Sequence, residues 1–320
     1  DARTSAVGLE FRPWSSLMLR ATHSTAFKPI LSYSAVQNPL ERTASITDPR
    51  MGGTRYVVDT IATGGVPPEL APERSWTTTV GATYRPSSSM NVTLTLWDTK
   101  FRDRISFLAL QSIIDNEALY PGRVVRDAAS GLIDSVDGRQ VNISLIRTSG
   151  VDLGMDWSWY FGAGSLHPSI AATYVHKYEE QLTPESALQD WRAIYNRAGG
   201  WAPKWKVVPR LTWEHQNWLR LMVAGRYVSS YQDAVAYSSG PMAGRYGTLG
   251  NFWLMDTNVD FSLNKIFARS PFTDVRLALG ATNLLNKLPD YCVACGVSGY
   301  DSSQYDIMGR TIYAELRVGL

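Results

Sequence analysis

Residues 205–227 read WKVVPRLTWEHQNWLRLMVAGRY. Before the central Gln216 and Asn217, every second side chain is apolar and most of those between are charged or polar; afterwards the alternation resumes. The apolar positions are Trp205, Val207, Pro209, Leu211, Trp213, Leu219, Leu221, Val223, Gly225 and Tyr227. The opposite positions include Lys206, Arg210, Thr212, Glu214, Arg220, Met222, Ala224 and Arg226. Because successive strand side chains point to opposite faces, the stretch predicts a β-hairpin with one apolar and one polar face.

The same alternation recurs over residues 151–159, 253–263 and 311–320. It predicts an all-β, antiparallel sheet with two unlike faces, which a soluble sandwich would also have. The connections separate these alternatives. About eleven strands are expected, joined alternately by short turns and by loops much longer than compact soluble domains use. The short turns are 12–16, 85–89, 161–165, 215–218 and 268–273; the long loops are 27–72, 104–139, 178–203, 231–250 and 288–305. This arrangement is typical of a transmembrane β-barrel, with short periplasmic turns and long extracellular loops.

Composition agrees with a barrel in a membrane. The chain has 11% aromatic and only 19% charged residues, and its net charge of +2 gives no basis for nucleic-acid binding. No stretch approaches the roughly 18 to 20 apolar residues of a membrane-spanning helix. If the short turns are periplasmic, the first strand, Ser5 to Phe11, and the last, Thr311 to Leu320, both descend. An even-stranded barrel then requires an odd number of further strands upstream. The N-terminus is neither an initiating Met nor a signal peptide, so we expect preceding sequence.

Several segments resemble the C-terminal region of TonB-dependent receptors, in the order in which that family has them. They are WSSLMLRATHSTAFKPI, whose Arg20 to Pro29 run is similar to the family's R-A-x-x-S-x-x-F-[RK]-x-P, then ITDPRMGG, LAPERSWTTTVGATYRP, RTSGVDLGMDWSW, LGATNLLNKLP and GYDSSQYDIMGRTIYAELRVGL. The resemblance implies that residues 1–320 are the C-terminal part of a single 22-stranded barrel domain, supplying its last eleven strands. Leu320 departs from the family's usual terminal Phe or Trp, and no plug domain or TonB-box is present in this sequence.

The resemblance also implies a function. It is active import of a scarce ligand across the outer membrane of a Gram-negative bacterium, energised through TonB, with neither cofactor nor catalysis. The expected partners are the lipid bilayer, the TonB complex acting through the plug, and the N-terminal half of the barrel, as a separate or a cleaved chain. Siderophores, vitamins, sugars and peptides are all ligands of the family. The alternatives are a passive porin and, less compatibly, a secreted β-rich binding protein.

Cys292 and Cys295 form a C-x-x-C pattern in the last long loop. Such a pattern can be a redox centre, half of a zinc site or a loop staple. None of the four His residues is near in sequence, and no thioredoxin-like context surrounds the motif. We therefore expect a disulfide and no metal site.

Charged residues of the polar face should line the lumen and pair across strands. They are Lys206, Arg210, Glu214, Arg220, Arg226, Asp256, Asp260, Arg276, Glu315 and Arg317. No nucleophile accompanies the carboxylates, so no catalytic residue is predicted. Aromatic residues beside the short turns should form the lower membrane girdle: Trp14, Tyr84, Trp157, Trp159, Tyr160, Trp218 and Phe267. Tyrosines in the long loops are the candidate ligand contacts: Tyr231, Tyr237, Tyr246, Tyr291 and Tyr300.

Overall fold

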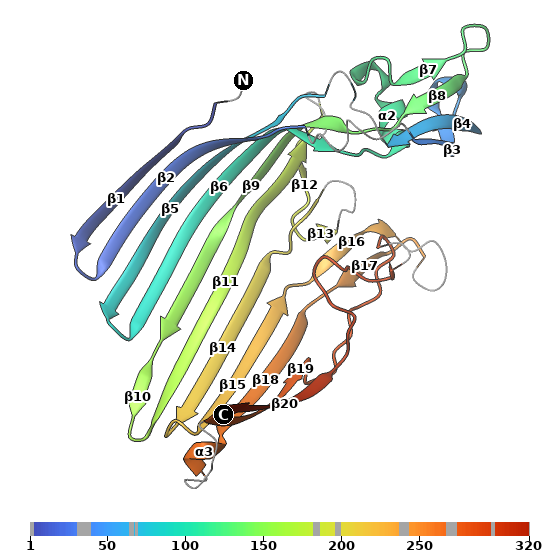
Figure 1. Cartoon of the computed structure of the whole chain (residues 1–320). Helices are drawn as coiled ribbons and strands as arrows, with labels where there is room; N and C mark the ends of the chain where they lie inside the picture. The colour runs from blue at the N-terminus through green and yellow to red at the C-terminus, as the bar shows by residue number, and fades with distance from the viewer. Residues whose placement is uncertain are drawn as a thin grey trace.

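A single large antiparallel sheet dominates the computed structural model (Figure 1). The structure describes residues 3–30, 40–63, 67, 70–181, 186–195, 200–236, 243–266, 274–295 and 298–319. Along the sheet the strand order is β1-β2-β5-β6-β9-β11-β14-β15-β18-β19-β20, with the short strands β10 and β12 pairing with β11. These strands are β1 Ala6–Trp14, β2 Leu17–Lys28, β5 Glu73–Ser87, β6 Met90–Ser106, β9 Val141–Trp157, β10 Trp159–Phe161, β11 Gly164–Gln181, β12 Gln189–Asp190, β14 Trp205–His215, β15 Leu219–Val228, β18 Phe252–Ser262, β19 Asp274–Thr282 and β20 Thr311–Gly319. The predicted eleven-strand antiparallel sheet is confirmed along this path.

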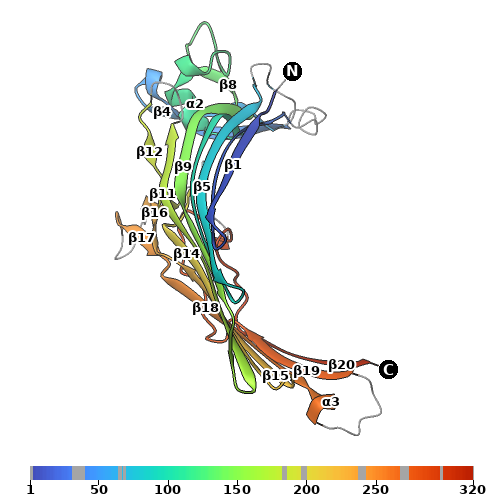
Figure 2. The same cartoon turned by 90° about the vertical axis from the view of Figure 1, so that its left-hand side faces the viewer.

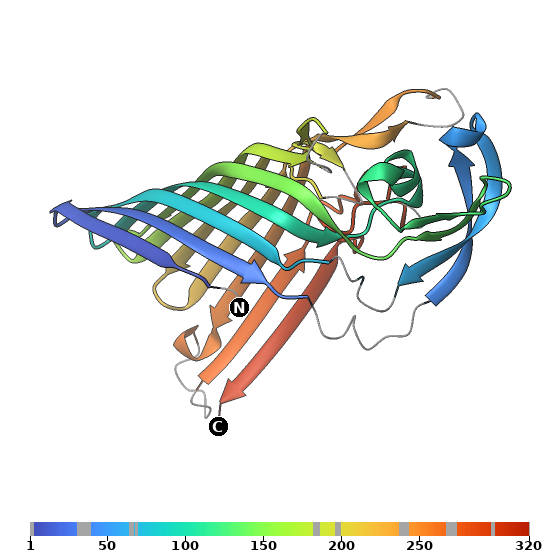
Figure 3. The same ribbon diagram turned by 90° about the horizontal axis from the view of Figure 1, so that it is seen from above.

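The sheet is curved and open. In the described part of the chain, β1 pairs with β2 alone and β20 with β19 alone. Figure 2 shows the curvature from the side, and Figure 3 shows from above that the strands form the wall of a trough. The sheet therefore has a concave inner face and a convex outer face.

Register fixes which side chains share each face. Leu211 lies opposite Val223, and Val223 lies opposite Thr257 on the next strand. Across the β9–β11 pair, Leu153 lies opposite Ala172. These residues belong to the outer face, which carries large exposed apolar side chains such as Leu94, Leu96, Leu153, Leu279 and Leu316. Register thus places the predicted apolar residues on one face, and we assign that face to the convex side of the sheet.

Aromatic side chains border this apolar band at both ends. On β14, Trp205 and Trp213 are eight positions apart, and on β18 the same spacing separates Trp253 from Phe261. Eight intervals of about 3.3 Å span about 26 Å along a strand, which matches the roughly 9–11 residues of a membrane-crossing strand. At the upper border, the rings of Tyr174 and Trp205 lie 4.7 Å apart and those of Tyr227 and Trp253 lie 4.5 Å apart. The outer face therefore has the dimensions of a bilayer core.

The loops between strands are more structured than the sequence indicates. A first loop unit, comprising residues 40–63 and 106–141, contains a four-stranded sheet in the order β3-β4-β8-β7 and a short helix. Its elements are β3 Leu40–Asp48, η1 Pro49–Met51, β4 Thr54–Thr63, α2 Leu110–Asp115, η2 Glu117–Leu119, β7 Val124–Arg126 and β8 Ile133–Asp137. Ile46, Val58, Ile113, Ile114, Ile133 and Val136 form its buried core.

A second loop unit contains β13 Ile194–Tyr195, β16 Tyr231–Ala236 and β17 Tyr246–Leu249, together with the disulfide loop. Its buried core comprises Tyr231, Leu249, Phe252, Leu254, Cys292, Cys295 and Tyr305. Both units lie at the end of the sheet opposite the short turns (Figure 1). They would cover the extracellular side of the predicted barrel.

Four of the five predicted short turns join adjacent strands as expected. The fifth, residues 268–273, lies outside the described residues, and so does Phe267; the helix α3 Leu263–Ile266, which precedes them, was not predicted. Tyr160 differs from the expectation for the lower girdle. It lies opposite Ser165 on the inner face and meets the His167 ring edge-on at 6.0 Å, because strand alternation continues through β10.

Candidate functional site

The inner face of the sheet is a continuous polar wall. One row of this wall consists of residues that lie opposite one another on successive strands: Glu10, Arg20, Gly81, Thr95, Asp152, Thr173 and Lys206. Arg20 Nη2 donates to Thr95 Oγ1 across 2.9 Å, and Thr173 Oγ1 donates to Asp152 Oδ1 across 2.7 Å. Hydroxyl groups dominate between β2 and β6, where Thr22 Oγ1 and Thr79 Oγ1 are hydrogen-bonded across 2.6 Å. Such a surface can bind water, polar solutes or another polar protein surface.

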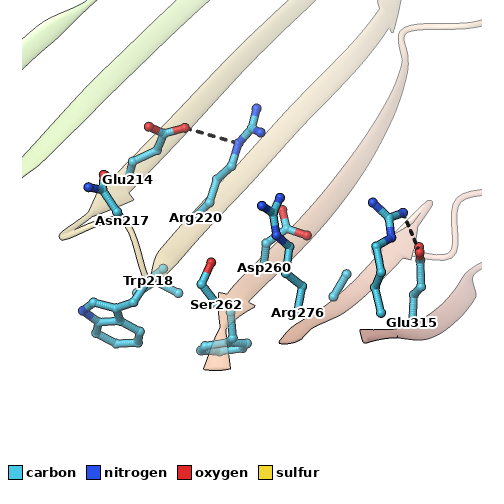
Figure 4. A pocket seen from close by; sticks show the side chains of 12 residues that line it. Glu214, Asn217, Trp218, Arg220, Asp260, Ser262, Arg276 and Glu315 are labelled. Carbon is cyan, nitrogen blue, oxygen red and sulfur yellow. Dashed lines mark hydrogen bonds and ion pairs between the residues drawn. The ribbon is translucent and has the colours of Figure 1, made fainter. Parts of the chain in front are cut away.

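Charged residues gather at the lower end of this wall, near the short turns (Figure 4). Arg220 lies directly opposite Glu214 on one side and Asp260 on the other. Its Nε is 3.5 Å from Glu214 Oε1. Higher up, Arg226 Nη2 lies 3.2 Å from Asp256 Oδ2. The structure therefore brings together the cross-strand pairs expected from alternation.

A cavity of about 380 Å³ opens among these charged groups. Its lining residues are Glu214, Asn217, Trp218, Leu219, Arg220, Asp260, Phe261, Ser262, Arg276, Ala278, Glu315 and Arg317. Arg276 and Arg317 face each other across β19 and β20 and each has an acidic neighbour on its own strand, at 3.0 Å from Asp274 and 2.8 Å from Glu315. Alternating charges of this kind fit a polar protein surface better than a single small ion.

A smaller cavity of about 180 Å³ lies at the upper end, where the inner wall meets the second loop unit. Thr173, Val175 and Lys206 contribute from the strands, and Trp201, Ala202, Pro203 and Gln304 cover them from the loops. The Gln304 Oε1 atom is buried, and no group among the described residues donates a hydrogen bond to it. An indole face, an ammonium and an amide oxygen on one small cavity suit a ring that bears hydroxyl or anionic groups.

The loop tyrosines have different surroundings. Tyr231 is only 2% exposed; its hydroxyl donates to Asp301 Oδ2 across 2.9 Å, and its ring lies 4.2 Å from that of Trp201. Burial raises the pKa of Tyr231, and burial also raises the pKa of Tyr305 to about 12. Tyr231 therefore packs the second loop unit and offers no free surface to a ligand. Tyr300 packs against the same core.

Tyr246 and Tyr291 are 54% and 67% exposed, so both can reach a ligand. Tyr237 lies outside the described residues. Sequence position alone does not separate buried from exposed tyrosines in a loop, because the packing partner of Tyr231, Asp301, is 70 positions away.

Cys292 and Cys295 form a disulfide with a Cα–Cα distance of 5.3 Å. Both residues are buried, and the backbone N–H groups of Val293 and Ala294, between them, donate to Asp233 Oδ2. The disulfide thereby fixes a tight turn whose amides hold a buried carboxylate on β16. Its role in this structure is to shape the second loop unit.

An ion-pair network that sequence patterns did not reveal holds the first loop unit. Asp48 is fully buried and accepts two hydrogen bonds from the Arg126 guanidinium, at 2.8 and 3.0 Å. Tyr56 Oη donates to the same carboxylate across 2.7 Å, and Arg126 also contacts Glu117 at 2.9 Å. The hydrogen bonds from Arg126 lower the pKa of Asp48 to about 2. The ITDPRMGG segment containing Asp48 was recognisable, but its partner Arg126 was not.

These features define a class. A curved antiparallel sheet with an apolar convex face, a polar concave face and structured loops at one end is the wall of an outer-membrane-type β-barrel. The family model "TonB dependent receptor-like, beta-barrel" matches residues 1–284, and the chain belongs to that family. No helix among the described residues is long and apolar enough to cross a membrane.

Solved structures of the family share this fold. A variant of the ferric enterobactin receptor PfeA of Pseudomonas aeruginosa superposes with a TM-score of 0.64 at 16% identity, covering 98% of this chain and 39% of that one. The siderophore receptor PirA of Acinetobacter baumannii gives 0.63 at 14% identity, with 98% and 40% covered. The copper transporter OprC gives 0.54 at 16% identity, with 97% and 39% covered. The chain thus spans about two fifths of the length of these structures, and no curated protein matches it.

Proposed function

We propose that this chain is the C-terminal part of a barrel that imports a scarce ligand across the outer membrane, with energy supplied through TonB. The observation that carries the proposal is the division of one sheet into an apolar convex face with aromatic borders and a polar concave wall. The first face suits lipid, and the second suits a lumen that holds water, a plug and a passing solute. The two loop units would stand over the entrance.

Further strands are needed to close the barrel. An open sheet in hydrocarbon leaves two edges of backbone N–H and C=O groups without partners, and each group costs several kcal/mol. About ten residues on each edge would exceed the roughly 5–15 kcal/mol that stabilises a whole domain. We infer that β1 and β20 pair with strands outside residues 1–320, in a barrel of 22 strands that also carries a plug.

The lower charged cluster is the surface we assign to that plug. Arg220, Arg276 and Arg317 lie beside Glu214, Asp260 and Glu315 in one cavity, so a polar domain could exchange many hydrogen bonds there. These hydrogen bonds and ion pairs could break and re-form readily if the plug moved, because each is partly exposed and individually weak.

Siderophore-type ligands are the first class to test, because PfeA is named a ferric enterobactin receptor and PirA a siderophore receptor. The intact receptor would be expressed in a strain lacking its own catecholate receptors and supplied with radio-iron-loaded enterobactin. We expect binding on ice and, on warming, accumulation that stops when TonB is deleted. Accumulation that continues without TonB would indicate the passive porin instead. Binding of neither enterobactin nor a hydroxamate siderophore would reject the siderophore class while leaving TonB-dependent import of another ligand open to the same assay.

A further inference from the structure

A group of five cations lies on the convex face, just above the upper aromatic border. This outer cationic patch consists of Arg74 on β5, Lys100 and Arg102 on β6, Arg147 on β9 and Lys177 on β11, all of them exposed. Lys177 lies in one row with Ser149, Asp98 and Thr78, below the other four cations, and the apolar row of Val80, Leu96 and Val151 comes next. The patch therefore stands where lipid headgroups meet the outer face of the predicted barrel, and not in its lumen.

Register sets like charges directly against one another in this patch. Arg74 lies opposite Arg102, and Lys100 lies opposite Arg147. Residues directly opposite on one face have Cβ atoms about 4.5–5.5 Å apart, and like charges there are destabilising. The repulsion within these two pairs destabilises the folded sheet, and an anion bound between the pairs would relieve it.

Few carboxylates of the protein lie near these cations. Asp98 lies one row below Lys100, and Glu179 lies opposite Arg147. Among the residues the structure describes, however, none of the five cationic groups comes within 4.0 Å of a carboxylate oxygen. Asp190, beyond Glu179, is already paired with Arg192 at 3.5 Å. Five cations against Asp98 and Glu179 leave an excess of positive charge on this surface.

The Arg102 guanidinium is held in place by an aromatic ring. Its Cζ lies 5.7 Å from the centre of the Trp76 ring, within cation–π range, and Trp76 lies opposite Lys100 on the same face. A stacked guanidinium keeps its N–H groups free to form paired hydrogen bonds with a phosphate.

We propose that the outer cationic patch binds the phosphate-bearing headgroup of an anionic lipid in the leaflet nearest the loop units. The apolar row of Val80, Leu96 and Val151 continues directly below the patch and would contact the acyl chains of the same molecule. That continuity favours a lipid over a free phosphate, which would use the cations alone. The inference goes beyond ligand import and requires only that the sheet spans the membrane with its loop units outward.

The test uses the intact receptor, purified in non-ionic detergent, stripped of lipid and titrated with a diphosphorylated glycolipid. An Arg102→Gln/Arg147→Gln variant removes one cation from each opposed pair. We expect about 25-fold weaker binding, from about fivefold for each cation near a lipid surface. Arg102→Lys/Arg147→Lys keeps both charges but loses the stacked guanidinium with its paired donors, so its affinity should fall between those of the wild type and the Gln double variant. The matched control Arg42→Gln/Arg245→Gln removes two exposed cations from the loops and should bind like the wild type.

A thermal readout separates a lipid site from a structural role. Without lipid, Arg102→Gln/Arg147→Gln should unfold at a higher temperature than the wild type, because the repulsion is relieved, and the glycolipid should stabilise it less. If that double variant does not fold, Lys100→Gln carries the same comparison. Unchanged affinity in the folded variant, equal affinity for the dephosphorylated glycolipid, or equally strong binding of inorganic phosphate would each overturn the proposal. If the wild-type receptor binds the glycolipid as expected but imports no ligand, the result contradicts the proposed function and not the lipid site.

Discussion

Arg126 donates two hydrogen bonds to Asp48, 78 positions earlier in the chain. These bonds tie the loop between β6 and β9 to the loop between β2 and β5. Asp48→Asn should loosen the first loop unit, because the amide cannot accept both hydrogen bonds with the strength of a carboxylate. Disrupting a buried pair typically costs about 3–5 kcal/mol. Hydrogen exchange in the intact receptor should show faster exchange over residues 40–48 and 124–137. Asp59→Asn, on the exposed side of β4, is the control and should leave both segments unchanged.

The same carboxylate predicts an acid limit for this unit. The pKa of Asp48 is about 2, against an ordinary value of 3.8. A lowered pKa means that the stabilisation is fully present above pH 3.8 and is lost as the pH falls from there toward 2. The difference corresponds to about 2 kcal/mol. Protection of residues 40–48 should therefore hold from pH 7 to 4 and fall below that; a loss already complete at pH 5 would contradict the assignment.

Adjacent residues on β19 test the two faces. Leu279 lies opposite Val259 and Ala314 on the convex face, whereas Ala278 lies opposite Asp260 and Glu315 on the concave one. Leu279→Arg should destabilise the barrel by about 2–4 kcal/mol at mid-bilayer depth. Ala278→Arg should be milder, because the new guanidinium meets two carboxylates. Urea unfolding in lipid vesicles measures both variants, and equal losses would mean that the faces are reversed.

The disulfide should matter for the second loop unit and not for the barrel. Cys292→Ala/Cys295→Ala should assemble into the membrane normally, because the residues lie above the apolar band. Limited proteolysis should then cut residues 288–305 faster than in the wild type. The native disulfide should also resist mild reductant until the unit unfolds, since Cys292 is fully buried. Failure of the double variant to reach the membrane would show that the disulfide is needed for assembly.

The loop tyrosines divide into structural and ligand-facing groups. Tyr231→Phe removes the donor to buried Asp301, which should cost the second loop unit about 1–3 kcal/mol. Tyr291→Ala should leave that unit intact, because the residue is 67% exposed, yet weaken binding of iron-loaded enterobactin, the ligand tested first. Hydrogen exchange and equilibrium binding of radio-iron-loaded enterobactin measure the two effects separately. If Tyr231→Phe alone lowered binding while exchange stayed unchanged, the division would be wrong.

Much of the main sheet was predictable because its information is local. Alternation over residues 205–227 fixed the hairpin, its faces and its turn, and the short connections fixed which strands are neighbours. The structured loops were not predictable in this way. The contact of Asp48 with Arg126 and that of Tyr231 with Asp301 depend on two segments meeting in space, and neither segment carries a periodic pattern. The outer cationic patch was also hidden, since Arg74 and Arg102 become opposed only once the β5–β6 register is known.

The eight-residue interval between aromatic borders has a consequence for where the protein can reside. Because the backbone of a β-strand is already close to fully extended, the interval from Trp205 to Trp213 has a fixed length. A bilayer thicker than that length would have to thin around the protein, at a fraction of a kcal/mol for each ångström of mismatch. The bacterial outer membrane is thinner than average. In a thick, sterol-rich bilayer the surrounding lipid, and not the sheet, would bear the deformation.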